Sequence, residues 1–216
     1  MPRGLFVVLE GGDYSGKGTQ AVKLAEHILN LSEDNDVLIT HEPTWRAKEI
    51  KRRLAEDESA YSDAEKMAGF YVEDRRIHSR DIIDPNLDNG VIVIGNRYYL
   101  STLFYQSIQG VSLSRLVDMH MHPEILTPDL TLLLDITPKT GDKRAEKRER
   151  APEKKFERKM FRDLVYQKYL EIIHSEKYRG IFDPIEIING NESADEVFNN
   201  IKNVFNPVYE KWRESR

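Results

Sequence analysis

A glycine-rich turn between a predicted strand and a predicted helix is the feature that most constrains this chain. A short apolar run that ends with Leu9-Glu10 leads into residues 11–19, which hold four glycines and one lysine, and helix-forming residues follow. A polyphosphate needs inward-pointing backbone N–H groups, glycines that let the backbone approach, a helix N-terminus and a cation. These parts occur here in order, so residues 11–19 are predicted to form a phosphate loop. A chance glycine turn is the alternative, and the flanking strand and helix argue against it.

The chain is long and apolar enough to bury the core of one domain, with 216 residues of which 39% are hydrophobic. We therefore expect a single domain over residues 1–216. The lack of Cys excludes disulfides and thiolate metal sites. No apolar run reaches about 18 residues, so we expect no membrane partner, no signal peptide and a cytoplasmic location. The net charge of −5 argues against nucleic acid as a partner, since proteins that bind it usually carry a basic surplus.

Apolar runs of strand length alternate with helical patterns along the chain. The predicted strands are residues 7–10, 37–40, 91–94, 130–135 and 185–188. One long helical pattern runs from Ser62 to Leu87. A terminal helix is predicted to begin at Ser193, which forms a capping box with Glu196. This alternation predicts an α/β fold with a parallel sheet and helices on both faces.

Polar residues follow two of the predicted strands, at the edge where open parallel sheets bind ligands. Glu42 comes just after strand 37–40 and precedes Pro43, which cannot continue a sheet ladder. Glu42 is either a ligand contact or part of an ordinary turn, and the residues alone leave both open. Arg97 follows strand 91–94, where a guanidinium is suited to a bidentate clamp on a phosphate.

Tyr71 and Arg75 are four residues apart in the long helical pattern, so they lie on one side of the helix. Together they are able to stack on and hydrogen-bond a flat base. A core Tyr beside an Arg that reaches solvent is the alternative, and the residues alone favour it.

A basic segment covers residues 142–159. It is either a solvated pair of helices held by ion pairs or a mobile cover that brings guanidinium groups onto phosphates. For the second role we expect Arg144, Arg148 and Arg150 to act.

Several motifs, in this order and spacing, give the chain a family resemblance. They are Glu-Gly-Gly-Asp-Tyr-Ser-Gly-Lys-Gly-Thr-Gln at 10–20, Glu42-Pro43, Asp74-Arg75, Asn96-Arg97-Tyr98, Ser101-Thr102, Tyr105-Gln106 and Pro-Asp-Leu-Thr-Leu-Leu-Leu-Asp at 128–135. The chain resembles thymidylate kinases, a family of P-loop nucleoside monophosphate kinases, over nearly its whole length. The resemblance implies a three-layer P-loop NTPase fold with a mobile basic lid at about 142–159.

The resemblance also implies an activity, which is transfer of a phosphoryl group from ATP, with Mg²⁺, to dTMP. It implies a homodimer. The catalytic residues would be Lys17, Arg97 and the lid residues Arg144, Arg148 and Arg150. ATP would bind to Gly11, Gly12, Asp13, Tyr14, Ser15, Gly16, Lys17, Gly18 and Thr19. The acceptor would contact Asp13, Glu42, Pro43, Tyr71, Arg75, Arg97, Thr102, Tyr105 and Gln106.

Individual roles follow from the same resemblance. Tyr71 would stack on the thymine ring, and Arg75 would bond its exocyclic oxygen. Thr102 would contact the edge of the base, and Tyr105 would crowd the 2′ position of the sugar and so favour deoxyribose. Asp13 would serve the sugar hydroxyl or the Mg²⁺ ion. Tyr14 is not basic, which implies that the lid rather than the loop supplies an arginine.

Two positions depart from the family pattern near the metal. Gly18 stands where many phosphate loops have a hydroxyl residue, and Asn96 stands where the family has Asp. They predict weak metal binding or slower turnover. His41 and Thr44-Trp45 also depart from the pattern, on the acceptor side. Two other functions stay open: a kinase of the same fold for another acceptor, such as dUMP or dGMP, and a non-catalytic ATP-binding regulatory protein.

Overall fold

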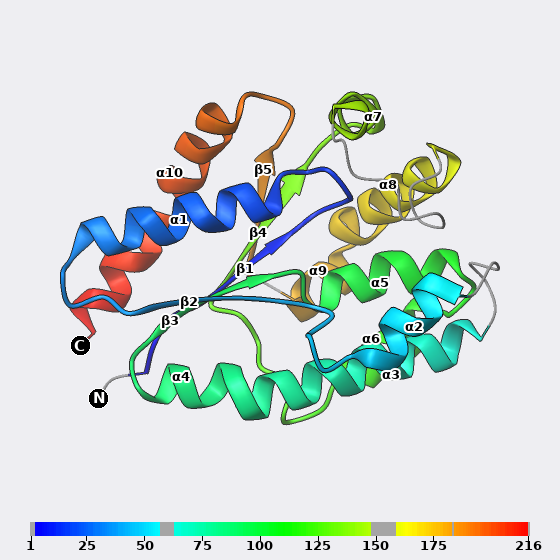
Figure 1. Cartoon of the computed structure of the whole chain (residues 1–216), viewed down its shortest axis with the longest axis horizontal. Helices are drawn as coiled ribbons and strands as arrows, with labels where there is room; N and C mark the ends of the chain where they lie inside the picture. The colour runs from blue at the N-terminus through cyan, green and yellow to red at the C-terminus, as the bar shows by residue number, and fades with distance from the viewer. Residues whose placement is uncertain (1–2, 57–62, 148–158, 183, 216) are drawn as a thin grey trace.

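The computed structural model describes residues 3–56, 63–147, 159–182 and 184–215 (Figure 1). Its centre is a five-stranded parallel sheet with the strand order β2-β3-β1-β4-β5. The strands are β1 (Phe6–Glu10), β2 (Val37–His41), β3 (Ile92–Asn96), β4 (Leu130–Asp135) and β5 (Ile185–Asn189). Each of them overlaps one predicted strand, so the predicted parallel α/β sheet is confirmed.

Helices connect the strands. They are α1 (Lys17–Leu31), α2 (Lys48–Glu56), α3 (Ala64–His78), η1 (Ser79–Ile83), α4 (Asp84–Asp88), α5 (Tyr99–Ile108), α6 (Leu113–His120), α7 (Pro138–Glu146), α8 (Lys159–His174), α9 (Glu176–Phe182) and α10 (Ala194–Glu214). The long helical pattern corresponds to α3, a π-helical turn η1 and α4. The capping box at the start of α10 is confirmed. None of the described helices is long and apolar enough to cross a membrane.

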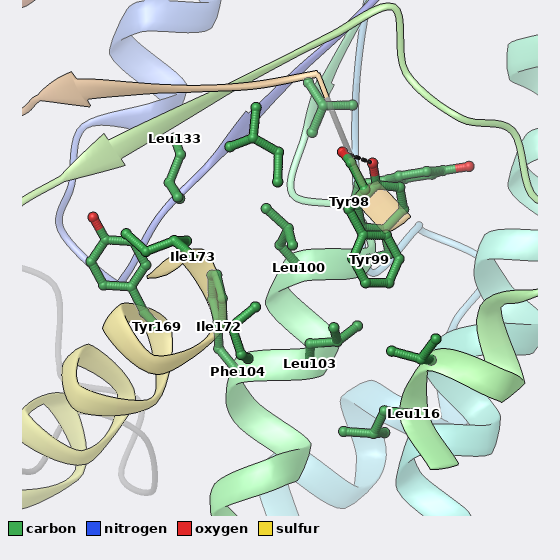
Figure 2. Packing of buried hydrophobic residues seen from close by; sticks show 14 of the residues in the cluster. Tyr98, Tyr99, Leu100, Leu103, Phe104, Leu116, Leu133, Tyr169, Ile172 and Ile173 are labelled. Atoms are coloured by element: carbon green, nitrogen blue, oxygen red, sulfur yellow. Dashed lines mark hydrogen bonds between the residues drawn. The ribbon is translucent and has the colours of Figure 1, made fainter. Parts of the chain in front are cut away.

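Helices cover both faces of the sheet, which confirms the three-layer arrangement. Alternate residues of β1 serve the two layers, because successive strand side chains point to opposite faces. Val7 and Leu9 pack in the core cluster that contains residues of α1 and α10. Phe6 and Val8 pack in the cluster that contains residues of α5 and α8 (Figure 2). In Figure 1, α1 and α10 lie together on one side of the sheet, and α3, α4 and α5 lie on the other.

The carboxyl ends of the three strands on one side of the sheet lie next to one another. Leu9 of β1 and His41 of β2 both pair with Asn96 at the end of β3. The segments that follow these strands therefore emerge side by side, and they carry the phosphate loop, Glu42 and Arg97.

The predicted basic lid is described only in part. Helix α7 ends at Glu146 and α8 begins at Lys159. Arg148 and Arg150 lie outside the described residues, so their predicted role stays a prediction.

Candidate active site

The phosphate loop between β1 and α1 has the backbone of an anion cradle. Gly11 and Gly16 have φ values of 138° and 95°, in the left-handed region that favours glycine. A Cβ atom on Gly11 would lie 2.7 Å from the carbonyl oxygen of Leu134, so this position has no room for a side chain. Gly16 immediately precedes α1, whose N-terminal N–H groups and positive dipole end favour an anion there.

The side chain of Lys17 folds back into the phosphate loop. Its Nζ atom donates hydrogen bonds to the carbonyl oxygens of Gly11 (2.9 Å) and Gly12 (2.7 Å) and to Oγ of Ser15 (3.2 Å). The side chain is buried, so its positive charge is held within the loop. The ammonium and the backbone N–H groups are thus placed to meet the oxygens of one polyphosphate.

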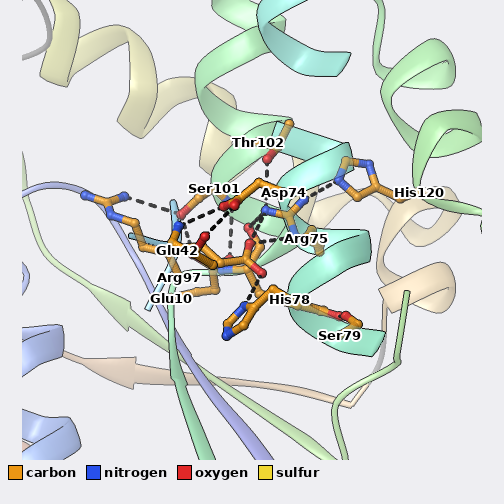
Figure 3. Close-up of polar contacts among 12 residues, drawn as sticks. Glu10, Glu42, Asp74, Arg75, His78, Ser79, Arg97, Ser101, Thr102 and His120 are labelled. Atoms are coloured by element: carbon orange, nitrogen blue, oxygen red, sulfur yellow. Dashed lines mark hydrogen bonds and ion pairs between the residues drawn. The ribbon is translucent and has the colours of Figure 1, made fainter. Parts of the chain in front are cut away.

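The carboxylate of Glu10, the last residue of β1, holds the start of α5. One of its oxygens accepts hydrogen bonds from the backbone N–H groups of Tyr98 (2.8 Å) and Ser101 (3.0 Å), and the other accepts from Oγ of Ser101 (2.6 Å). The first N–H groups of a helix have no partner within it and favour a negative charge. This buried contact joins the root of the phosphate loop to α5 (Figure 3). It is outside the predicted set of site residues.

Arg97 lies between the phosphate loop and α5. Its φ value of 71° is uncommon for a residue other than glycine, and its N–H donates to the carbonyl oxygen of Leu9 (3.0 Å). The guanidinium forms an ion pair with Asp13 through Nη2 and donates from Nη1 to Oγ of Ser101 (3.3 Å). Its central carbon is 5.4 Å from the ring centre of Tyr105. The side chain is thus held from the loop side and the helix side together.

The ion pair sets the charge state of Asp13. Burial alone would raise the pKa of this carboxyl group, but the charges of Arg97 and Lys17 and the hydrogen bonds from Tyr105 and Arg97 together lower the pKa below its ordinary value. Asp13 is therefore ionised at neutral pH.

A cavity of about 120 Å³ opens beside Asp13 and Arg97, and we call it the acceptor cavity. All of the residues predicted to contact the acceptor line it: Asp13, Glu42, Pro43, Tyr71, Arg75, Arg97, Thr102, Tyr105 and Gln106. They come from the phosphate loop, the turn after β2, α3 and the segment 97–106. Leu54, Tyr98 and Ser101 also line the cavity and lie outside the predicted set.

Arg75 is buried in the wall of this cavity, with 1% of its surface exposed. Its Nε and Nη2 atoms lie 2.8 Å and 2.7 Å from the same carboxylate oxygen of Glu42. Nη2 also donates to the carbonyl oxygen of Tyr98 (2.8 Å) and to Oγ1 of Thr102 (3.1 Å). Nη1 contacts Nε2 of His120 (Figure 3). A buried guanidinium needs such partners, because an unpaired charge in the interior is costly.

Two further contacts hold α3 against the turn after β2. Nδ1 of His78 lies 3.0 Å from the second carboxylate oxygen of Glu42. Asp74 accepts hydrogen bonds from the backbone N–H (2.7 Å) and Oγ1 (2.5 Å) of Thr44. Thr44 is one of the departures from the family pattern, and its hydroxyl and N–H are both bonded within this turn.

A second hollow, of about 320 Å³, lies between the phosphate loop and the turn that leads into α10. Arg144 of α7 lines it. Its Nη1 atom donates to the carbonyl oxygens of Tyr14 (3.4 Å) and Ser15 (3.3 Å), and its Nη2 atom donates to those of Gly190 (2.7 Å) and Glu192 (3.0 Å). Arg144 therefore contacts the phosphate loop, and it is absent from the lining of the acceptor cavity.

The described residues include no group of three or more His, Cys, Asp or Glu side chains placed to hold a metal ion. Asp13, the predicted metal ligand, is paired with Arg97. Oδ1 of Asn96 is buried and lacks a hydrogen-bond partner within the described part of the chain, and a Cβ atom on Gly18 would lie 3.8 Å from Nδ2 of the same side chain. Such an oxygen suits a water molecule bound to Mg²⁺, which keeps several waters when it binds with a nucleotide. The residues fit a Mg²⁺ ion that arrives with a phosphate ligand.

Comparison with known proteins gives a consistent result. The family model described as "Thymidylate kinase" matches residues 9–201. A thymidylate kinase of Ruegeria pomeroyi is 36% identical over 202 residues, which cover 90% of this chain and 90% of the relative. A thymidylate kinase of Mycoplasma capricolum is 30% identical over 218 residues, covering 98% of this chain and 97% of the relative. A probable thymidylate kinase of Staphylothermus marinus is 33% identical, covering 93% of this chain and 94% of the relative.

Proposed function

The chain belongs to the thymidylate kinase family and is thus a nucleoside monophosphate kinase, and we propose that it transfers the γ-phosphoryl group of ATP to the 5′-phosphate of dTMP. The products are dTDP and ADP. The observation that carries this proposal is the position of Arg97, which is paired with a residue of the phosphate loop and also lines the acceptor cavity. One guanidinium thereby adjoins the sites of both nucleotides.

On the donor side, the phosphate loop binds the polyphosphate of ATP through its N–H groups. Lys17 exchanges its contacts with the carbonyl oxygens of Gly11 and Gly12 for contacts with phosphate oxygens. Arg144 acts on the donor side of the loop, since its guanidinium contacts the carbonyl oxygens of Tyr14 and Ser15.

At the point of transfer, Arg97 binds the acceptor phosphate and neutralises charge on the group in flight. The acceptor oxygen is already anionic, so no residue has to remove a proton from it. Catalysis then consists of positioning and charge stabilisation, which are provided by Lys17 and Arg97 among the described residues.

On the acceptor side, dTMP occupies the acceptor cavity. Tyr71 stacks on the thymine ring, Arg75 donates to its exocyclic oxygen, and Thr102 contacts the edge of the base. Tyr105 lies beside Arg97, near the place where the sugar meets the phosphate, and favours deoxyribose by occupying the space of a 2′ hydroxyl.

A Mg²⁺ ion bound with ATP would supply positive charge to the phosphates. Asn96 would help to hold it by accepting a hydrogen bond from its water shell, because its buried Oδ1 atom has no hydrogen-bond partner among the described residues. A homodimer and a cytoplasmic location are also implied by the family resemblance, and sedimentation of the purified protein tests the first.

The test is a coupled assay of ADP release, with ATP and each of dTMP, dUMP, dGMP and dCMP in turn. We expect the highest kcat/KM with dTMP. A reaction without acceptor measures background ATP hydrolysis, and Lys17→Ala measures turnover without the loop cation. A higher kcat/KM with dGMP or dUMP would reassign the acceptor. ATP binding without transfer to any monophosphate would favour a regulatory nucleotide-binding protein.

A further inference from the structure

The hydrogen bond between Arg75 and His120 defines the state of the histidine ring (Figure 3). Arginine has N–H donors and no acceptor, so Nε2 of His120 is the acceptor and carries no hydrogen. Nδ1 of the same ring lies 2.6 Å from the carbonyl oxygen of Leu116, which only accepts, so Nδ1 carries the hydrogen. The two contacts fix His120 as a neutral ring in one tautomer and one orientation.

The other contacts of Arg75 show which of its donors is left for a ligand. Nε and Nη2 face Glu42, the carbonyl oxygen of Tyr98 and Oγ1 of Thr102. Nη1 carries two hydrogens, and its only acceptor among the described residues is His120. One hydrogen of Nη1 therefore remains for a ligand. Because Arg75 lines the acceptor cavity, that hydrogen is the donor that it offers to a bound base.

We propose that His120 is a positioning residue for recognition of the acceptor base. By accepting one hydrogen of Nη1, it fixes the plane of the Arg75 guanidinium so that the other hydrogen meets the C4 carbonyl oxygen of thymine. This inference rests on the proposed function, in which Arg75 bonds that oxygen. Cytosine has an amino group at C4, which is a donor, so the same geometry disfavours dCMP.

The surroundings of His120 keep it in the accepting state. Burial and the positive charge of Arg75 lower its pKa to about 3. The ring is buried, and it makes an edge-to-face contact with Tyr99 at 6.4 Å between ring centres. The neutral imidazole accepts a hydrogen bond without adding a second negative charge beside Glu42.

Two substitutions separate positioning from simple support of the fold. His120→Asn keeps an amide near the place of Nδ1, where it still donates to Leu116, but the shorter side chain loses Arg75. His120→Gln extends to the place of Nε2 and again accepts from Arg75. His122→Asn is the matched control, since His122 is exposed and two residues further along the chain.

The experiment measures kcat and KM for dTMP and dCMP, and KM for ATP, with thermal unfolding of each variant. We expect His120→Asn to raise KM for dTMP about tenfold with kcat within about twofold, because a misplaced donor loses roughly one hydrogen bond. The ratio of kcat/KM for dTMP over dCMP should fall about as much, and His120→Gln should restore it to within about threefold.

The experiment distinguishes two kinds of failure. Equal losses for dTMP and dCMP, or a Gln variant no better than the Asn variant, would overturn the positioning role. Failure of the wild-type protein to phosphorylate dTMP would instead reject the proposed function, and this is measured first in the same assay.

Discussion

Asp13 and Arg97 are 84 positions apart in the sequence and form an ion pair where the phosphate loop meets the acceptor cavity. Arg97 is the charge that lowers the pKa of Asp13 the most. Before a substrate arrives, the ion pair holds the guanidinium of Arg97 at the edge of the acceptor cavity. An anionic phosphate that enters the cavity then competes with Asp13 for this guanidinium.

Replacement of Arg97 by Ala should reduce kcat by about 100-fold or more, because it removes a charge stabiliser from the transferred group. The fold should survive, which circular dichroism and thermal unfolding check. Arg115→Ala is the control, since the side chain of Arg115 forms an exposed ion pair with Glu65. A kcat for Arg97→Ala near that of the wild type would contradict the assigned role.

Gly11 and Gly12 are neighbours with different requirements. A Cβ atom on Gly11 would collide with the carbonyl oxygen of Leu134, whereas one on Gly12 meets no heavy atom within 4 Å. We therefore expect Gly11→Ala to lower the free energy of unfolding by about 2 kcal/mol or more, and Gly12→Ala by less than about 0.5 kcal/mol. Urea unfolding of the two variants provides the comparison. Equal stabilities would show that the loop relaxes around the added methyl group.

The combined change of Gly18→Ser and Asn96→Asp should strengthen metal binding. Both changes are tolerated sterically, because a Cβ atom on Gly18 would lie 3.8 Å from Nδ2 of Asn96, an ordinary contact distance, and Asp has nearly the same shape as Asn. A hydroxyl and a carboxylate are the groups that hold Mg²⁺ in many phosphate-loop enzymes. The free Mg²⁺ concentration for half-maximal rate should fall about fivefold. Titration of Mg²⁺ at saturating ATP measures it, and ATP binding without metal is the control. An unchanged midpoint would place the ion away from both residues.

His120 should make the protein less stable in acid. Its pKa is about 3 in the folded chain, against an ordinary value of 6.5, so the folded chain binds its proton at lower pH than the unfolded chain does. The contribution is intact above pH 6.5 and is lost as the pH falls from 6.5 towards 3. In that range the free energy of unfolding falls by about 1.4 kcal/mol per pH unit from this group.

Urea unfolding at pH 7, 6 and 5 tests this dependence, with His120→Gln as the comparison. The difference in unfolding free energy between wild type and variant should shrink as the pH falls. Parallel curves for the two proteins would mean that His120 titrates normally in the folded chain.

The strands and the capping box of α10 are predictable from sequence because their signals are local. The apolar run Leu5 to Leu9 ends at the charged residue Glu10, and Ser193 and Glu196 are three positions apart. The order of the strands has no such signal, since β1 pairs Val7 with Leu130, far along the chain. The π-helical turn η1 lies within an unbroken helical pattern, so the sequence alone does not mark it.

In the candidate site, too, some residues can be predicted from the sequence and others cannot. Arg97 is predictable because it directly follows a buried strand. The partners of Arg75 are not, because His120 lies 45 positions further along and at the end of a helix that the pattern does not reveal. The burial and the tautomer of His120 depend on how the helices pack, so a single His in the sequence predicts neither.

The hydrogen bonds of Glu10 tie the end of β1 to the first turn of α5. The start of the phosphate loop and the helix that lines the acceptor cavity are therefore held at a fixed distance from each other once the chain has folded. Any movement that encloses the substrates then belongs to segments that Glu10 does not contact.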